Sequence, residues 1–189
     1  MNFVSRVALR GAPLETPRLR LAPLDPVDAP ELFAAVERSR PELEPWLPWV
    51  PYQLTEHDSR TYAEYSVDDW DAGRALRLTL RDRARGALLG IVSLEAANHA
   101  HLSLELGYWI DSEVVGRGLM TEAARAAVRW AFLAVGAHRV RVAASTENAR
   151  SLGVIRKLGF TYEGIARHAE LIMGRWLDHA VFARLSTDP

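Results

Sequence analysis

The alternation of apolar and polar residues predicts several strands in the first two thirds of the chain. Residues Arg18 to Leu24 alternate with a period of two, the pattern of a strand that buries one face. Three more strand-like runs cover Leu76–Arg81, Ala87–Ala96 and Leu102–Ile110, with short polar connections between them. Strands joined by short turns pair antiparallel, so we expect these three to form a meander.

Helical spacing of apolar residues marks four other segments. They are Ala29–Arg38, Thr55–Trp70, Thr121–Val135 and Asn148–Leu158. Gly136 and Gly159 follow the last two segments and are typical helix ends. Between the first two, Pro41 to Tyr52 holds four prolines, which exclude a long helix and predict a loop or short turns.

The order of these elements predicts a mixed α/β fold with a mostly antiparallel central sheet and flanking helices. A short buried strand, His138–Ala144, follows the helix at Thr121–Val135. Because a helical crossover joins parallel strands, we expect this strand to run parallel to Leu102–Ile110. Two last strands are expected at Phe160–Glu163 and Val181–Leu185.

A turn with two glycines, Gly116 and Gly118, joins the predicted strand at Leu102–Ile110 to the helix over Thr121–Val135. Such a turn leaves backbone N–H groups unpaired at the positive end of a helix, where they bind phosphate oxygens. Glycine suits the position because it adopts left-handed backbone angles and has no side chain to block a ligand. The pattern alone fits either a pyrophosphate site or a structural turn.

A second motif favours the pyrophosphate site. The segment VGRGLMTEA, Val115–Ala123, is similar to the loop of the GNAT acetyltransferase superfamily that holds the pyrophosphate of acetyl-CoA. The segment ENARSLGVIRKLGF, Glu147–Phe160, resembles the helix of that family that packs beside the pantetheine arm. Val115 and Met120 depart from the usual loop residues, at little cost because the contacts of the loop are backbone N–H groups. The resemblance implies a GNAT fold, in which the two parallel strands splay apart around the pantetheine.

Further matches narrow the resemblance to the RimJ/RimL branch, whose better-known members acetylate the N-terminal amine of ribosomal proteins. The matching segments are TPRLRLAPL from Thr16, ELEPWLPWV from Glu42 and HAELIMGRWLDHAVFARL from His168. The resemblance implies that acetyl-CoA is the co-substrate. The residues it assigns to cofactor binding are Val115, Gly116, Arg117, Gly118, Leu119, Met120, Thr121 and Asn148.

Acetyl transfer from a thioester to an amine needs a base for the ammonium proton and a donor for the departing thiolate. By resemblance, Ser151 is the donor, although a serine in a first helical turn also serves to satisfy a backbone group. Glu170 matches the glutamate that accepts the proton in this branch. Glu105 stands where many GNAT enzymes hold a carboxylate that works through a water, and either carboxylate is otherwise a solvated or paired group. His168 is a further candidate that would share the work of the base.

Aromatic residues in the proline-rich segment are candidates for acceptor binding. Trp46, Trp49 and Tyr52 either fill the core or form the walls of a pocket for an extended peptide end, and the family resemblance favours the pocket. Proteins of this branch pair as homodimers, so the resemblance implies a homodimer here. Ile172, Met173 or Trp176 would then contact the partner subunit, unless these side chains fill the core of the monomer.

Composition limits the remaining functions. A chain of 189 residues with 49% hydrophobic content fits one domain over residues 1–189, with residues 1–15 as an N-terminal extension. A formal charge of -1 gives no sign of nucleic-acid binding. The absence of cysteine excludes a thiolate acyl-enzyme, and neither a signal-peptide core nor an apolar run of membrane-spanning length occurs, so we expect a cytoplasmic protein. His99 and His101 lack acids at ligand spacing, so no metal is expected.

These observations predict an acetyl-CoA-dependent N-acetyltransferase that transfers the acetyl group directly to a protein N-terminal amine. Two alternatives stay open. One is acetylation of a small amine such as a polyamine, an amino acid or an aminoglycoside. The other is a non-catalytic acyl-CoA-binding module.

Overall fold

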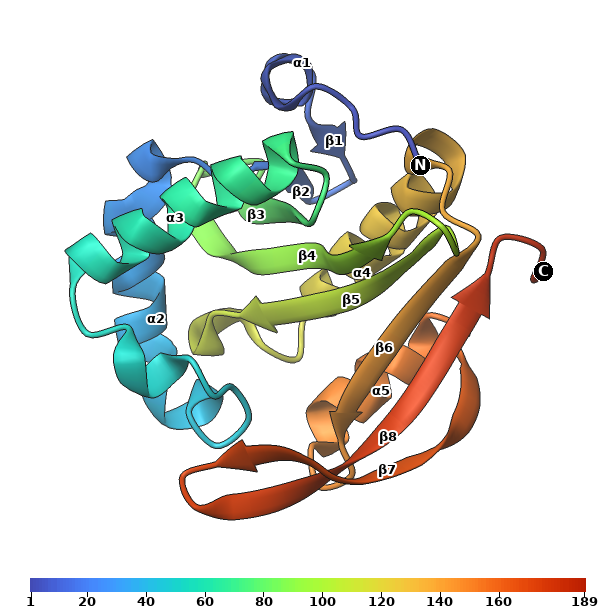
Figure 1. The fold of residues 1–189 in the computed structure, drawn as a ribbon. Coiled ribbons are helices and arrows are strands. Elements are labelled where there is room, and N and C mark those ends of the chain that lie inside the picture. Colours follow the sequence, from blue (N-terminus) through green and yellow to red (C-terminus); the bar gives the residue numbers. More distant parts are fainter.

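The computed structural model describes all residues from Met1 to Pro189, and its central element is a sheet of eight strands in the order β1-β2-β3-β4-β5-β6-β8-β7 (Figure 1). The strands are β1 (Leu14–Glu15), β2 (Leu19–Pro23), β3 (Leu76–Asp82), β4 (Leu88–Asn98), β5 (Ser103–Ile110), β6 (Arg139–Ser145), β7 (Thr161–Ile172) and β8 (Arg175–Leu185). All neighbours pair antiparallel except β5 and β6, which are parallel. The predicted mixed sheet, its meander and its parallel pair are confirmed.

The parallel pair is short. Strands β5 and β6 are in register only where Ser103–Glu105 lies beside Arg139–Arg141. Beyond that point β5 stays paired with β4 up to Ile110, and β6 stays paired with β8 up to Ser145. The two strands therefore diverge, as the GNAT resemblance predicts, and each presents a free edge to the gap between them (Figure 1).

Helices cover both faces of the sheet. In Figure 1, α3 lies in front of the sheet, α4 and α5 lie behind it, and α2 closes one end. The helical elements are α1 (Arg6–Gly11), η1 (Pro26–Asp28), α2 (Ala29–Leu43), η2 (Val50–Tyr52), α3 (Glu56–Asp71), η3 (Ser112–Val114), α4 (Leu119–Trp130), the π-helical η4 (Ala131–Val135) and α5 (Ala149–Lys157). The α4 residues Ala123, Ala124 and Ala127 are fully buried, because small side chains let that helix lie close against β4 and β5.

Helix α2 continues through Pro41 to Leu43, beyond the predicted end at Arg38. A proline inside a helix removes one backbone hydrogen bond, and the side chain of Arg40 offsets that loss. Its guanidinium donates to the carbonyl oxygens of Val50 and Gln53, each at 2.6 Å. These bonds tie the end of α2 to the turns that follow, so only the remainder of the proline-rich segment is a loop with short turns.

The last two strands are much longer than predicted. Strand β7 is mostly exposed on both faces, and its register with β8 shifts between Tyr162 and Gly164 and again between Ala166 and Glu170. Each shift interrupts the period-two pattern, because a bulge adds an unpaired residue to one strand. His168 lies in the second bulge with a left-handed φ of 47°, and its backbone N–H donates to a carboxylate oxygen of Asp178 at 2.8 Å.

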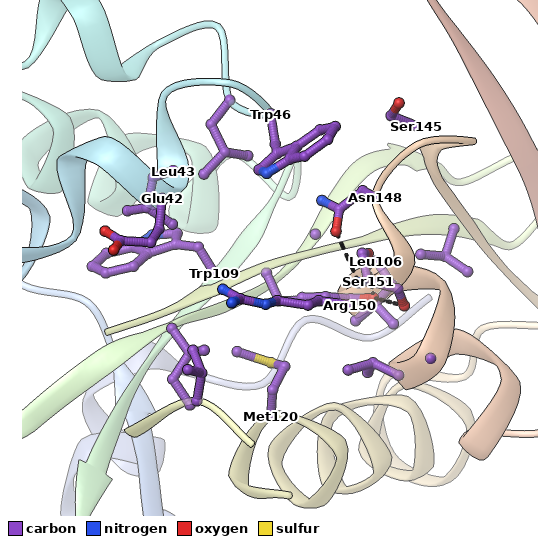
Figure 2. Close-up of a pocket in the computed structure, with 18 of the residues that line it drawn as sticks. Glu42, Leu43, Trp46, Leu106, Trp109, Met120, Ser145, Asn148, Arg150 and Ser151 are labelled. Carbon is purple, nitrogen blue, oxygen red and sulfur yellow. Dashed lines mark hydrogen bonds between the residues drawn. The ribbon is translucent and has the colours of Figure 1, made fainter. Parts of the chain in front are cut away.

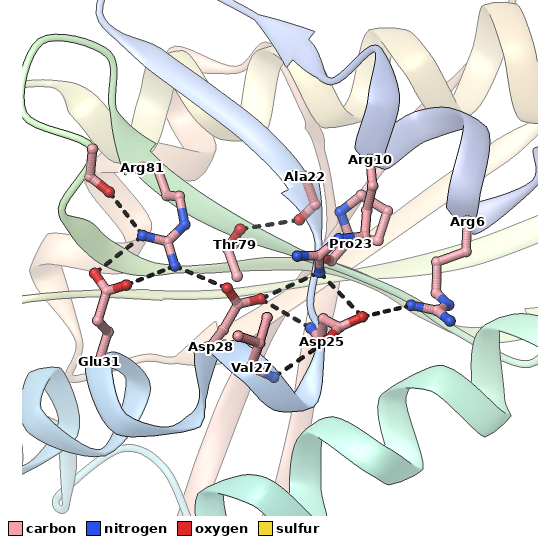
Figure 3. Close-up of polar contacts among 11 residues, drawn as sticks. Arg6, Arg10, Ala22, Pro23, Asp25, Val27, Asp28, Glu31, Thr79 and Arg81 are labelled. Atoms are coloured by element: carbon pink, nitrogen blue, oxygen red, sulfur yellow. Dashed lines mark hydrogen bonds and ion pairs between the residues drawn. The ribbon is translucent and has the colours of Figure 1, made fainter.

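The expected N-terminal extension packs on the sheet and helices. Leu9 of α1 is buried, and the Trp70 indole donates to the Val4 carbonyl at 2.9 Å. Figure 3 shows how α1, β2, β3 and α2 meet at two carboxylates: Asp25 accepts from Arg6 at 2.9 Å, and Asp28 from Arg81 at 2.9 Å. These pairs fix the start of α2 on the sheet. No helix is both long and apolar enough to cross a membrane.

Candidate functional site

A cleft of about 850 Å³ opens at the gap between β5 and β6. Its walls come from the end of α2 and the following turn, β5, the turn before α4, β6, the start of α5, and the β7–β8 hairpin. In Figure 2, Trp46 and Trp109 lie on one side of this cleft and Asn148 and Ser151 on the other, with the Arg150 side chain extending into it. Residues from both faces of β5 line the cleft, because the cleft meets that strand at its edge.

The glycine turn forms one end of the cleft. Gly116 and Gly118 adopt left-handed φ angles of 78° and 75°, and Gly118 is the N-cap residue of α4. Helix α4 therefore begins at Leu119, two residues before the predicted start. The backbone N–H groups of residues 115–121 make no hydrogen bond within the protein. Unpaired N–H groups at the N-terminus of a helix form an anion-binding site.

Buried polar contacts hold this turn in place from outside the cleft. Asp111, at the end of β5, is 2% exposed and accepts from Arg38 of α2 at 2.6 Å and from the backbone N–H of Glu113 at 3.0 Å. Ser39 accepts from the backbone N–H of Ser112 at 2.9 Å. A paired, hydrogen-bonded carboxylate tolerates burial, so the turn starts from a fixed point.

Seven of the eight predicted cofactor residues line the cleft, and Arg117 does not. The Arg117 guanidinium donates to the Glu113 carbonyl at 3.2 Å. The side-chain oxygen of Asn148 caps α5 by accepting from the Ser151 N–H at 3.0 Å. The cation Lys157 also lines the cleft, at the same helix.

Ser151 lies in the cleft and contacts a residue that the sequence analysis did not select. The Ser151 hydroxyl is 2.9 Å from the hydroxyl of Tyr108, which reaches it from β5. Burial raises the pKa of Tyr108 to about 12, although the hydrogen bond with Ser151 acts in the opposite direction. The strand pattern held a usable signal, because alternation placed Tyr108 on the face of Leu104 and Leu106, and a buried tyrosine hydroxyl needs a partner.

Both candidate bases line the cleft, in different environments. Glu105 is paired with Arg141 at 2.6 Å, as cross-strand neighbours of β5 and β6. Glu170 lies 3.4 Å from the His179 imidazole. Burial raises the pKa of Glu170; the nearby His179 lowers it, and the negative charge of Glu105 raises it further. A carboxylate with a raised pKa is better matched to accepting a proton near neutral pH.

His179 and not His168 is the histidine of this site. His168 stacks on Trp176 with ring centroids 5.7 Å apart and does not line the cleft. The sequence analysis missed His179 because it placed the start of the last strand at Val181. The ring of His99 contacts the Gly73 carbonyl instead, and no three or more metal-binding side chains are grouped together.

Two of the three predicted acceptor residues line the cleft, and the third lines a hollow beside it. Trp46 and Trp49 line the cleft, and Trp49 packs on Trp109 with ring centroids 6.2 Å apart. Tyr52 is 81% exposed and lines an adjoining hollow of about 550 Å³, which Trp49 and Trp109 also border. Tyr52 therefore does not fill the core, which was the alternative role considered for these aromatic residues.

The arrangement offers N–H donors to an anion at the glycine turn and carboxylates to an ammonium group elsewhere in the same cleft. The carboxylates that line it are Glu42, Glu95, Glu105 and Glu170. A molecule with a phosphate end and a reactive end that meets an amine fits this distribution of charge.

Known proteins share this architecture. A solved structure of RimL, a ribosomal L7/L12 alpha-N-protein acetyltransferase in complex with coenzyme A, has a TM-score of 0.87 at 24% identity, over 93% of this chain and 98% of that one. The putative ribosomal N-acetyltransferase YdaF of Bacillus subtilis (strain 168) is 29% identical over 170 residues, which cover 87% of this chain and 90% of that protein. The spermidine N(1)-acetyltransferase of Escherichia coli (strain K12) is 33% identical over 91 residues, 48% of this chain and 49% of that protein.

The family profile described as acetyltransferase (GNAT) domain matches residues 18–161. This match covers the meander, the glycine turn, α4 and α5, which together build most of the cleft. The chain therefore belongs to the GNAT acetyltransferases and is an acetyl-CoA-dependent N-acetyltransferase rather than a non-catalytic acyl-CoA-binding module.

Proposed function

We propose that this enzyme transfers the acetyl group of acetyl-CoA directly to the N-terminal α-amine of a protein. The observation that carries the proposal is that a single cleft combines the unpaired N–H groups of residues 115–121 with Glu170 and Ser151. The first set suits a diphosphate, and the second suits the proton transfers of amine acylation.

The glycine turn would bind the diphosphate, and the gap between β5 and β6 would hold the pantetheine arm. RimL is a relative of the same fold that binds coenzyme A. In the gap, the free edges of both strands present backbone groups that a pantetheine amide can pair with. Lys157 and Arg150 add positive charge to the cleft.

Direct transfer needs two proton movements. Glu170 takes one proton from the ammonium group, and the neutral nitrogen then forms the C–N bond. Backbone N–H groups on the free edge of β5 are available to stabilise the oxyanion. When the C–S bond breaks, its electron pair goes to sulfur, to which Ser151 donates a hydrogen bond, and the second proton lost by nitrogen completes the thiol. The chain has no cysteine to carry an acetyl group between the substrates.

Charge pairing supports a peptide rather than a polyamine as acceptor. Two of the cleft carboxylates are already neutralised: Glu95 accepts two bonds from Arg77, at 2.9 and 2.8 Å, and Glu105 pairs with Arg141 at 2.6 Å. A polycation needs several unpaired carboxylates, whereas an N-terminal peptide presents one ammonium group and an amphipathic chain for Trp46 to contact. The second candidate is a small amine, which the match to spermidine acetyltransferase favours.

The cofactor assignment predicts that Gly116→Asp weakens coenzyme A binding by more than about tenfold, because a carboxylate would face the phosphates. Gly116 is the better position, since no atom lies within 4 Å of its added Cβ, whereas one at Gly118 approaches Arg18 at 3.7 Å. The control is Gly174→Asp in the turn between β7 and β8. The φ of Gly174 is 77°, so aspartate strains the backbone there as much as it does at Gly116. Titration calorimetry giving equal affinity for both variants would contradict the assignment.

For the base, we expect Glu170→Gln to lower turnover at neutral pH by about 10²- to 10⁴-fold, and Glu105→Gln to lower it less. A base works when deprotonated, so wild-type activity falls as the pH drops through the raised pKa of Glu170. Glu105→Gln removes a negative charge that raises this pKa, so the acidic limb of the pH–rate profile moves to lower pH. Loss of activity in the Glu105 variant alone reverses the assignment.

The acceptor is tested by CoA release with a panel of N-terminal peptides, their N-acetylated forms as controls, and spermidine. We expect CoA release only with peptides that have a free N-terminal amine. We also expect Trp46→Ala to raise KM for the peptide and to leave KM for acetyl-CoA unchanged. Mass spectrometry of protein N-termini from cells with and without the enzyme identifies the substrate. Faster release with spermidine than with any peptide would instead support the small-amine alternative.

A homodimer is also part of the proposal, through the tip of the β7–β8 hairpin. Met173 and Trp176 are 69% and 56% exposed there, whereas Ile172, at 4%, fills the core and is not available to a partner. Light scattering at micromolar concentration should give the dimer mass, and Trp176→Glu should give the monomer. The equally apolar but distant Leu133→Glu serves as control. A monomer mass for the wild type rules the dimer out.

A further inference from the structure

The hydroxyl group of Tyr108 spans the gap beside β5 to reach the first turn of α5. It lies 2.9 Å from the Ser151 hydroxyl and 3.2 Å from the Ser151 backbone carbonyl. Both acceptors within its reach therefore belong to the residue proposed to stabilise the departing thiolate. The aromatic ring packs against the core formed by α4 and the sheet, which fixes where the hydroxyl lies.

The phenol of Tyr108 is a permanent hydrogen-bond donor. Burial raises its pKa to about 12, so it keeps its proton at any pH at which the enzyme works. A buried donor without an acceptor is costly, so this hydroxyl donates to one of the two Ser151 oxygens.

The choice between these oxygens decides what Ser151 can do. If Tyr108 donates to the carbonyl, the Ser151 hydroxyl can donate its own proton to the Tyr108 oxygen. Ser151 then has no hydrogen-bond donor to offer to a ligand in the cleft. If Tyr108 donates to the Ser151 hydroxyl oxygen, the serine proton is free to bond elsewhere. A thiolate only accepts hydrogen bonds, so the second arrangement is the one that fits the breaking C–S bond.

We propose that Tyr108 is a positioning residue that donates a hydrogen bond to the Ser151 hydroxyl and so directs the serine proton toward the sulfur of the departing thiolate. The inference rests on the proposed function of Ser151. In this arrangement the Tyr108 hydroxyl bonds to Ser151 and not to the sulfur, and it transfers no proton. The chain of two hydroxyls strengthens the bond to sulfur, because each hydrogen bond polarises the next.

The test compares Tyr108→Phe, Ser151→Ala and the double variant, with Tyr162→Phe as the matched control. Tyr162 lies on the outer strand β7, packs edge-on against Phe182 and lines no part of the cleft. Phenylalanine keeps the ring in the core, so folding and coenzyme A affinity measured by calorimetry should stay at the wild-type level in Tyr108→Phe.

We expect Tyr108→Phe to lower kcat about tenfold with KM for acetyl-CoA unchanged, the rate equivalent of one hydrogen bond. Ser151→Ala should be slower still, and the double variant should be no slower than Ser151→Ala alone, because Tyr108 acts through the serine. Tyr162→Phe should match the wild type.

The other outcomes separate this inference from the proposed function. A slow Ser151→Ala with a wild-type Tyr108→Phe overturns the role of Tyr108 and leaves that of Ser151 standing. Equal slowing by Tyr108→Phe in both backgrounds means that the phenol acts independently of Ser151, which also overturns the inference. Wild-type turnover in Ser151→Ala refutes the proposed role of Ser151, and a slow Tyr108→Phe beside it would make the phenol itself the donor to sulfur.

Discussion

The short pairing of β5 with β6 is the constraint on which the rest of this structure depends. Only Ser103–Glu105 and Arg139–Arg141 are in register, and after them each strand keeps its other neighbour and leaves one edge free. A free edge in the middle of a sheet usually invites aggregation. Here the two edges face each other across the cleft, and α4 lies behind β4 and β5 (Figure 1). The opening costs sheet hydrogen bonds and creates the only place where a long, thin ligand can pass between strands.

Polar contacts outside the cleft hold the elements that form it in place. Asp111 and Ser39 fix the glycine turn to α2. Glu122, in the first turn of α4, accepts from the Thr16 hydroxyl at 2.6 Å and from the backbone N–H of Arg18 at 2.9 Å. The carboxylate thus sits at the positive end of the helix without covering its N–H groups.

Apolar runs with strand or helix spacing were sufficient to predict the meander, the parallel pair and the helices, since most of these elements bury a regular face. They were not sufficient for β7 and β8, where bulges break the period and most side chains are exposed, nor for the last turn of α2, where Arg40 compensates for Pro41. Most candidate site residues lie at one cleft because motif residues follow strand ends and helix starts. His179 was missed because its strand was predicted too short, and Tyr108 because its partner comes from an element 43 positions away in sequence.

The same divergence leaves few hydrogen bonds between the two sides of the sheet. Strands β1 to β5 lie on one side of the gap and β6, β8 and β7 on the other, and three residue pairs of β5 and β6 join the two sides within the sheet. One hydrophobic core draws buried residues from both sides. A ligand that bonds to both free edges acts as a missing strand between them. Its binding free energy then adds to the stability of the whole fold, because the unfolded chain has no such pair of edges to bind.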